Sequence, residues 1–399
     1  MDLDFPPTRI AALEQLNTFL PKAGSIYAGQ RNYDLSAENG LNVSALSPYI
    51  RHRMLSETEV LQAVLNRFAP SSADKFIQEV LWRTYWKGWL EQRPEVWHRY
   101  CDGLQKAIND LQTQSGLRQN WEHACNGTIG IDCFDHWAHQ LVRTGYLHNH
   151  ARMWFASIWI FTLRLPWELG ADFFMRHLFD GDPASNTLGW RWVAGLQTKG
   201  KTYLARPDNI QKYTGGKFNP SGLATNAPPL DGPDHPALRP IPHQQNIDPG
   251  LVTGLLITEE DLHPTHLTSK IEGKPPVIGL LATQKRSPIK ISEKLGTFTK
   301  DSMQDAANRF ALHPSTFEIT TDPDTVLNWA LENSLQQVVT AYAPVGPTAT
   351  SLRKLYKILD EHSITLVQKQ RALDQNAWPH ATKGFFPFRK NIPDILATL

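Results

Sequence analysis

The chain has 399 residues, a formal net charge of +1 and an isoelectric point near 7.8. One hydrophobic core seldom supports a chain of this length, so we expect two domains. The balanced charge excludes a globally basic nucleic-acid-binding protein but is compatible with a local basic groove, and three cysteines without a close-spaced pair indicate neither a disulfide framework nor a metal site.

The beginning of the chain, MDLDFPPTRIAALEQL, lacks the basic stretch and apolar core of a signal peptide. No segment reaches the run of about 18 apolar residues that indicates a transmembrane helix. We therefore expect a cytoplasmic protein that is not attached to a membrane, and we expect it to be a monomer.

The first half of the sequence has the periodicity of α-helices. Apolar residues recur at intervals of three and four, and there is hardly any strand pattern before residue 200. The helical segments are residues 56–69, 72–92, 131–145, 150–165 and 169–179. Tryptophan is concentrated in the same half, because eleven of the 13 indoles precede residue 193. We expect an all-helical domain over residues 1–225.

Three groups of polar and aromatic residues in this half share helix faces. Asn149, Arg152 and Met153 are spaced i, i+3 and i+4. Glu79 and Trp82 are three residues apart on the predicted helix 72–92, whose apolar neighbours would force an ionised carboxylate to find a partner or a raised pKa.

The third group follows a helix start, where Asp182 is an N-cap and Pro183 the first helical residue. Asn186 and Trp190 then lie four residues apart. Each group also has a purely structural interpretation, as core aromatics, a helix cap or an ion pair between Arg152 and Asp180.

Residues 226–249 are rich in proline, which lacks a backbone donor and disfavours helix, so this stretch is predicted to be an extended linker. In residues 250–399, short β-branched runs alternate with helical stretches, which predicts βαβ units on a mainly parallel, Rossmann-like sheet. The runs are residues 251–258, 276–283, 316–321, 336–343 and 363–370. Neither G-x-G-x-x-G nor a P-loop motif is present to bind a phosphate.

Residues 20–222 resemble the FAD domain of the DNA photolyase and cryptochrome family in the order, spacing and type of six motifs. The motifs are IYAGQRNY, NVSALSPYIRHRMLS, QEVLWRTYW, TGYLHNHARMW, LPWELGADFFMRHLFDGDPASNTLGWRWVAG and GGKFNP. The fifth motif is long and highly specific. The resemblance implies a flavoprotein with a U-shaped FAD.

The resemblance also implies which residues bind the cofactor. The expected FAD ligands are Tyr27, Ser44, Leu46, Ser47, Arg152, Asp180, Asp182 and Asn186. The first four would line the phosphates and the ribityl chain. The next two would form an ion pair against the isoalloxazine ring, and the last two would face its polar edge and its N5 atom.

The implied catalytic residues are Glu79, Asn149, Trp82, Trp192 and Met153. The carboxyl would hydrogen-bond the damaged pyrimidine and stabilise its radical anion, the amide would bridge the adenine region and the lesion, and the two indoles would flank a flipped-out pyrimidine dimer that the thioether touches. Arg31 and Arg83 match positions in the DNA-facing groove.

The identity of the lesion follows from two of these positions. Relatives that repair the (6-4) lesion typically have histidines where this chain has Asn149 and Met153. The sequence therefore favours splitting of a cyclobutane dimer in UV-damaged DNA: reduced FAD absorbs blue light, passes an electron to the dimer and regains it after the ring opens.

The order of the domains is inverted relative to the family, which begins with its α/β domain. GLLITEEDLHP resembles the start of that domain and TKGFFPFRKNIP its end, so we interpret the chain as a circular permutation. Some family features are changed: Val43 and Ala45 replace a usual threonine and arginine near the FAD phosphates, His150 replaces a common arginine, and the terminal helices after KFNP are missing.

The resemblance also implies a tryptophan chain for photoreduction of the flavin. Trp190 and Trp167 match its inner and middle members, whereas the outer position, near Leu111, holds no indole. Trp97, Trp121 and Trp137 are the candidate substitutes. Many members of the family carry a second, antenna chromophore, a folate or a deazaflavin, and the sequence assigns none to this chain.

Two other functions remain as alternatives. A cryptochrome-like blue-light receptor would use the same flavin photochemistry for signalling, and the altered arginines and the missing end favour it. A flavoprotein that binds single-stranded nucleic acid without repair is the third. The retained dimer-pocket residues favour the lyase.

Overall fold

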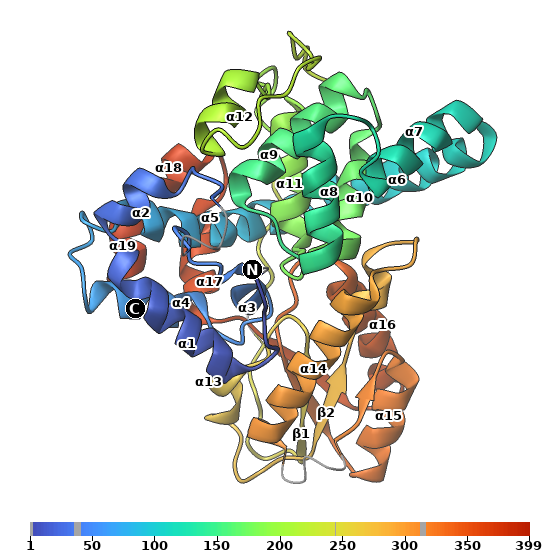
Figure 1. The fold of residues 1–399 in the computed structure, drawn as a ribbon. Coiled ribbons are helices and arrows are strands. Elements are labelled where there is room, and N and C mark those ends of the chain that lie inside the picture. The colour runs from blue at the N-terminus through green and yellow to red at the C-terminus, as the bar shows by residue number, and fades with distance from the viewer. Residues whose placement is uncertain (1–2, 36–40, 244, 312–316) are drawn as a thin grey trace.

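The computed structural model describes residues 3–35, 41–243, 245–311 and 317–399. A group of helices from the first half of the chain lies beside a parallel sheet with flanking helices from the second half (Figure 1). The predicted fold class, helices followed by a Rossmann-like α/β unit, is therefore confirmed. Among the helices of these described residues, none has the length and apolar character to cross a membrane.

Several helices of the helical part begin at capping residues that can be recognised in the sequence. Ser56 forms a capping box with Glu59. Asp182 caps the helix that begins at Pro183, as predicted. The elements are α1 (Arg9–Phe19), η1 (Leu20–Lys22), α2 (Ser25–Gln30), α3 (Ser47–Arg51), α4 (Glu57–Leu65), α5 (Asp74–Glu91), α6 (Glu95–Thr113), α7 (Ser115–Asn126), α8 (Asp132–Thr144), α9 (Asn149–Ser157), η3 (Ile158–Thr162), α10 (Trp167–His177), α11 (Pro183–Val193) and α12 (Pro207–Tyr213).

The predicted helix over residues 150–165 is divided in the structure. It is α-helical to the end of α9 and continues as one π-helical turn, η3. Arg164 then adopts a left-handed conformation with φ of 55°, and the chain reaches Pro166 before α10 begins. The change of winding ends the helix and turns the chain toward α10.

The sheet has five parallel strands in the order β3-β2-β1-β4-β5. Each strand lies within one of the predicted β-branched runs. They are β1 (Thr253–Thr258), β2 (Val277–Leu280), β3 (Ile319–Thr320), β4 (Gln337–Ala341) and β5 (Thr365–Lys369). In the centre of the sheet, Leu255 of β1 pairs with Val277 of β2 on one side and with Val339 of β4 on the other. The strand order reverses between β1 and β4, where α/β sheets usually bind ligands.

Helices cover both faces of this sheet. Leu256 and Val338 belong to a core with α15 (Pro323–Glu332) and α16 (Pro347–Glu361) on one face. The alternate residues Leu255 and Val339 face α14 (Glu293–Phe310) and share one continuous core with the helical part. Two short helical segments, α13 (Thr265–Thr268) and η4 (Thr283–Arg286), complete the connections near β1 and β2.

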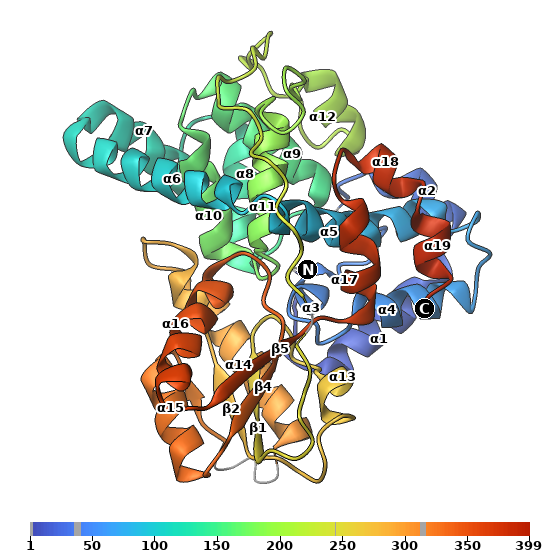
Figure 2. The same cartoon turned by 180° about the vertical axis from the view of Figure 1, so that it is seen from behind.

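The linker, residues 226–249, contains neither helix nor strand among its described residues. Its backbone is bonded to the helical part, since the N–H of Leu230 donates to the Ala194 carbonyl at 3.0 Å and that of Arg239 to the Gln92 carbonyl at 2.8 Å. It runs along the helices toward the sheet (Figure 2).

The end of the chain departs from the predicted division. We expected residues 250–399 to form one α/β unit, but after β5 the chain returns to the helical part (Figure 2). This segment comprises α17 (Ala372–Ala377), η6 (Trp378–His380), α18 (Phe385–Arg389) and α19 (Ile392–Leu396). Since both faces of the sheet are already covered, the segment buries its aromatic residues against α5.

Candidate functional site

Two adjoining cavities lie in the helical part, where α5, α9 and the loop before α11 meet. Their volumes are about 240 Å³ and about 520 Å³, and together they have the size expected of a cofactor or ligand site. Five residues line both cavities: Glu79, Arg83, Asn149, Arg152 and Asp180. We call the smaller one the α3 cavity and the larger one the indole cavity.

The α3 cavity contains the four residues expected at the phosphates and ribityl chain. Tyr27, Ser44, Leu46 and Ser47 all line it. Tyr27 is held by an edge contact with Phe76, with ring centroids 5.1 Å apart. The Ser44 hydroxyl accepts from the backbone N–H of Leu46 at 3.4 Å.

The backbone of the same cavity is strained at one residue. Ala45 lies between Ser44 and Leu46 and has φ of 50°, which is unfavourable for a side chain with a Cβ atom. Ala45 also lines the cavity. The strain therefore falls where the sequence departs from the family's usual arginine.

The indole cavity contains the aromatic residues expected around a base. Trp82 of α5 and Trp192 of α11 both line it, together with Met153 of α9. Trp82 is fixed in place because Phe385 stacks on it, with centroids 3.6 Å apart and an interplanar angle of 11°. Trp192 packs against Tyr203 at 5.7 Å.

Glu79 borders both cavities from α5. Burial raises the pKa of its carboxyl above the usual glutamate value, while the cations Arg31 and Lys75 act in the opposite direction. The Nε atom of Arg31 is 3.9 Å from the carboxylate. A carboxyl with a raised pKa, beside a cavity, is suited to donate a hydrogen bond to a ligand.

The expected ion pair between Arg152 and Asp180 is present. Nη2 of the arginine donates to Oδ2 of the aspartate at 2.8 Å, and its Nε donates to the Leu147 carbonyl at 2.9 Å. The other carboxylate oxygen, Oδ1, is buried and has no hydrogen-bond partner within the described part of the chain. The pair therefore presents an unused acceptor at the junction of the two cavities.

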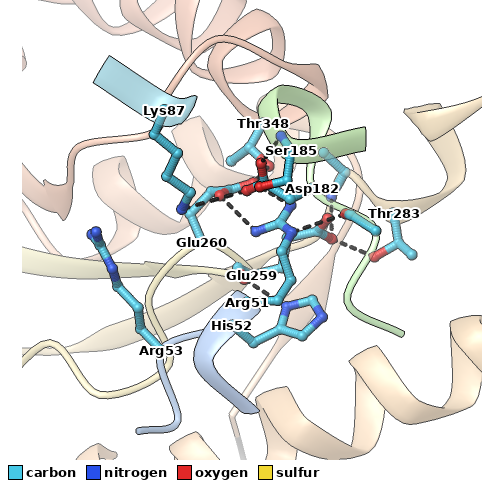
Figure 3. Close-up of polar contacts among 12 residues, drawn as sticks. Arg51, His52, Arg53, Lys87, Asp182, Ser185, Glu259, Glu260, Thr283 and Thr348 are labelled. Atoms are coloured by element: carbon cyan, nitrogen blue, oxygen red, sulfur yellow. Dashed lines mark hydrogen bonds and ion pairs between the residues drawn. The ribbon is translucent and has the colours of Figure 1, made fainter. Parts of the chain in front are cut away.

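Asp182 lies at the centre of a buried charge network (Figure 3). Its Oδ1 accepts from the Ser185 N–H at 2.8 Å, which caps α11. Its Oδ2 is 3.6 Å from Nζ of Lys87 and 3.4 Å from Nη2 of Arg83. Burial opposes ionisation of Asp182, but Lys87, Arg83 and Arg51 outweigh it and hold its pKa well below the usual range.

The network extends to the sheet through Arg51 at the end of α3. Its guanidinium donates to both carboxylate oxygens of Glu260, at 2.7 and 2.8 Å, and to the Gly181 carbonyl at 2.9 Å. Glu260 follows β1, and Thr348, which donates to it at 3.2 Å, follows β4. The crevice at the reversal of strand order is thus filled by an arginine of the helical part.

The amide of Asn186, one turn into α11, is also fixed. It donates from Nδ2 to the Ala171 carbonyl at 2.9 Å while lining the indole cavity. Asn149, the first residue of α9, lines both cavities, and the preceding His148 caps the helix through its ring nitrogen at 3.2 Å from the His150 N–H. All of the expected cofactor and catalytic residues border at least one of the two cavities.

The two arginines expected in a DNA-facing groove both lie near carboxylates of the protein. Arg83 faces Asp182 and also lies 3.8 Å from Glu57, and its side chain is 12% exposed. Arg31 donates to the Ala28 carbonyl at 2.9 Å and approaches Glu79. Each guanidinium thus lies near a carboxylate of the protein, and the contact of these two residues with DNA stays a prediction.

The predicted tryptophan chain is partly connected. Trp190 lines the indole cavity and makes an edge contact with Trp159 at 6.2 Å. Trp167 packs against Tyr100 at 5.6 Å, which packs against Trp97 at 5.2 Å. Of the three candidate outer members, Trp97 is the one joined to Trp167 through an aromatic neighbour.

The cavity walls fit FAD in the chemistry of their polar atoms. Asp180 Oδ1 and Trp190 Nε1 are buried without partners in the described residues, one an acceptor and the other a donor. A flavin and its ribityl chain carry both donors and acceptors. The two cavities join at Arg152 and Asp180, so that one extended cofactor has access to both.

Three features of the site were not predicted from the sequence. Tyr146 and His148 line the α3 cavity within a motif that was quoted for its later residues. Phe386 lines the indole cavity, but its sequence neighbourhood indicated only the end of an α/β domain. The pair between Arg51 and Glu260 has no local pattern from which it could be found.

Comparison with known proteins identifies the helical part. A model of the FAD-binding domain of DNA photolyase matches residues 76–223. The deoxyribodipyrimidine photo-lyase of Alkalihalophilus pseudofirmus is 30% identical over 234 residues, which cover 56% of this chain and 46% of that protein. The enzyme of the same name from Thermus thermophilus is 33% identical over 198 residues, covering 50% and 45%. The chain thus matches about half the length of these curated relatives or less.

Two solved structures overlap the chain to a similar extent. A bacterial class III photolyase from Agrobacterium tumefaciens has a TM-score of 0.44 and 26% identity, covering 52% of this chain and 43% of that one. A Synechocystis cryptochrome has a TM-score of 0.43 and 24% identity, covering 53% and 44%. The sequence matches carry the assignment: the helical part of this chain belongs to the DNA photolyase and cryptochrome family, whose cofactor is FAD.

Proposed function

We propose that the chain is a light-driven lyase that splits cyclobutane pyrimidine dimers in DNA. The observation that carries this proposal is the position of Glu79. Its carboxyl borders both the α3 cavity and the indole cavity, with Trp82 on the same helix and Asn149 on α9. A hydrogen-bonding group therefore borders both the cavity that we assign to the cofactor and the aromatic cavity that we assign to the pyrimidine dimer.

Each residue has a role that its environment supports. When bound, reduced FAD would supply a light-driven electron that returns after the ring opens. The protonated Glu79 would donate to a carbonyl oxygen of the dimer and stabilise the charge that develops there. Trp82 and Trp192 would hold the two pyrimidines by stacking, which is least costly for a damaged and poorly stacked pair.

The choice of lesion rests on Asn149 and Met153. Both line the indole cavity, and neither side chain titrates, so neither offers a proton to the lesion at neutral pH. This pair fits a cyclobutane ring, whose opening needs an electron and stabilisation of charge, better than a (6-4) product.

The second candidate is a blue-light receptor of the cryptochrome type. The pairing of Arg31 with Glu79 and of Arg83 with Asp182 favours it, because a cation that has a partner within the protein is less available to a DNA backbone. The aromatic walls of the indole cavity favour repair, since a receptor has no need of a dimer-shaped pocket.

The two candidates separate in one experiment. The purified protein is reduced without oxygen and illuminated with an oligonucleotide that carries one thymine dimer, and the product is analysed by chromatography. Recovery of intact thymines in the light, and not in the dark, supports the lyase. Light-driven changes of the flavin spectrum without recovered thymines support the receptor and contradict our proposal.

A further inference from the structure

Helix α18, in the C-terminal segment, presents a phenyl ring at the edge of the indole cavity. Phe386 lines this cavity and is 77% exposed, more than any other large apolar side chain among the described residues. Single exposed apolar residues are common on protein surfaces. What distinguishes Phe386 is its place on the rim of the candidate site.

The periodicity of α18 explains why this ring faces outward. Phe385 and Phe388, three residues apart, are buried, with exposed fractions of 4% and 0%. Phe386 lies between them and is on the other face of the helix. The inward pair anchors α18 to α5, because Phe385 stacks on Trp82 and Phe388 packs against Tyr85 at 5.4 Å.

The exposed face of α18 also carries positive charge. Arg389 and Lys390 lie three and four residues after Phe386, so they share its side of the helix, and both are exposed. Lys383, just before the helix, is exposed as well. The carboxylate of Asp74 is 3.3 Å from Arg389 and neutralises only part of this charge.

An aromatic ring with cations on one exposed face is the arrangement that binds single-stranded or unpaired nucleic acid, in which bases stack on rings and phosphates pair with cations. The anchor to Trp82 adds a positional constraint. Because Phe385 stacks on one face of Trp82, the backbone of α18 is fixed next to an indole that would hold an extruded pyrimidine.

We propose that α18 is a DNA-binding element, in which Phe386 stacks on the base that flanks the extruded pyrimidine pair while Arg389 and Lys390 contact the adjoining phosphates. This inference rests on the proposed function, since it takes DNA as the substrate of the indole cavity. It adds strand contacts at the end of the chain to those predicted for Arg31 and Arg83.

The test is a binding measurement in the dark. Fluorescence anisotropy is recorded with a labelled single-stranded oligonucleotide that carries one thymine dimer, and with the same oligonucleotide undamaged, at several salt concentrations. The variants are Phe386→Ala, Phe386→Trp, Lys390→Ala and, as a matched control, Leu331→Ala, which removes an apolar side chain that is 48% exposed on α15.

Loss of one base-stacking ring is expected to weaken binding about 5- to 150-fold in Phe386→Ala, with the salt dependence unchanged, and Phe386→Trp should restore it. Lys390→Ala should instead reduce the slope of log affinity against log salt by about 0.7, the value for one phosphate contact to a single strand. Leu331→Ala should bind as the wild type does. FAD content and melting temperature should be the same in all variants, because Phe386 and Lys390 are exposed.

The outcomes distinguish this inference from the proposed function. If the wild type prefers the dimer and Phe386→Ala binds as tightly as Leu331→Ala does, the role of α18 is refuted and the repair proposal stands. If damaged and undamaged strands bind equally and Phe386→Ala weakens both, the role of α18 stands and dimer recognition is refuted. If the wild type binds neither strand, both are refuted.

Discussion

Arg51 of α3 and Glu260 after β1 form a two-point ion pair, with N–O distances of 2.7 and 2.8 Å, in the interior between the helical part and the sheet. The side chains are 1% and 5% exposed. Arg51 also donates a hydrogen bond to the carbonyl of Gly181, the residue before Asp182. The sheet is thereby connected to the loop that borders the indole cavity.

Removal of the Glu260 carboxylate should therefore lower the stability of the protein. Glu260→Ala leaves the guanidinium of Arg51 buried without its counterion, which typically lowers the free energy of unfolding by about 3–5 kcal/mol. Denaturation by urea, followed by tryptophan fluorescence, measures the change. Glu293→Ala is the control, because its partner Lys290 is at the surface and an exposed pair contributes little. Equal stability of the two variants would contradict a structural role for the buried pair.

A second prediction concerns the docking of the C-terminal segment on α5. Alanine in place of a helical glycine normally stabilises a helix by up to about 1 kcal/mol. At Gly88, however, a Cβ atom would lie 2.7 Å from Cδ1 of Trp378 and 2.9 Å from its backbone Cα. We expect Gly88→Ala to destabilise the protein by about 1–3 kcal/mol through overpacking.

Thermal unfolding of the same variant provides the measurement. Gly29→Ala in α2 is the matched control, since no atom lies within 4 Å of its added Cβ. If Gly88→Ala proved as stable as Gly29→Ala, the C-terminal segment would not pack on α5 as described, and the placement of α18 would lose its support.

The third prediction is a pH dependence of repair. Desolvation beside the cavities raises the pKa of Glu79, so its carboxyl stays protonated to higher pH than a glutamate that is fully surrounded by water. Below this pKa the carboxyl can donate a hydrogen bond to the dimer, and above it the group is a carboxylate that repels the developing negative charge. Repair per absorbed photon should fall as the pH rises through the pKa of Glu79.

The controls for this profile are two substitutions at the same position. Glu79→Gln keeps a donor that does not titrate, so its profile should be flat over the same range. Glu79→Ala removes the donor and should lower repair about 10²- to 10³-fold, as loss of a charge-stabilising donor does in other enzymes. A pH profile that is the same in the wild type and in Glu79→Gln would assign the titration to another group.

The fourth prediction concerns photoreduction of the flavin. Trp190 borders the indole cavity, and Trp167 is joined to Trp97 through Tyr100. Trp190→Phe should abolish most of the light-driven reduction of the oxidised flavin, and Trp97→Phe should slow it. Absorption spectra recorded during illumination measure the rates.

Trp137→Phe serves as the control for photoreduction, because this buried indole stacks on Trp154 at 5.4 Å, away from the run through Tyr100. Reduction that is equally fast in Trp190→Phe and Trp137→Phe would show that the electron takes a different route.

The local parts of this structure could be predicted from the sequence. Alternating β-branched runs indicate all five strands, since buried parallel strands need apolar residues on both faces. The cap at Asp182 and the shared faces of Glu79 with Trp82 and of Asn149 with Arg152 follow from helical spacing alone. These residues line the cavities because spacing along a helix determines which side chains meet.

The contacts between distant segments could not be predicted in this way. The charge of Arg83 alone is consistent with a DNA groove. Its pairing with Asp182 and Glu57 could not be predicted, because both residues are distant from Arg83 in the sequence. The return of the C-terminal segment depends on Gly88, whose lack of a side chain makes room for Trp378. This contact between Gly88 and Trp378 produces no periodic pattern in the sequence from which it could be predicted.

The central claim is that this chain repairs dimers catalytically with light. The most direct test is to count the thymine dimers restored per protein molecule by chromatography, under blue light, after a single initial reduction and without added reductant. Because the electron would return after each ring opening, we predict many dimers restored per molecule in the light and none in the dark. At most one dimer per molecule, with the flavin oxidised in step, would contradict the account.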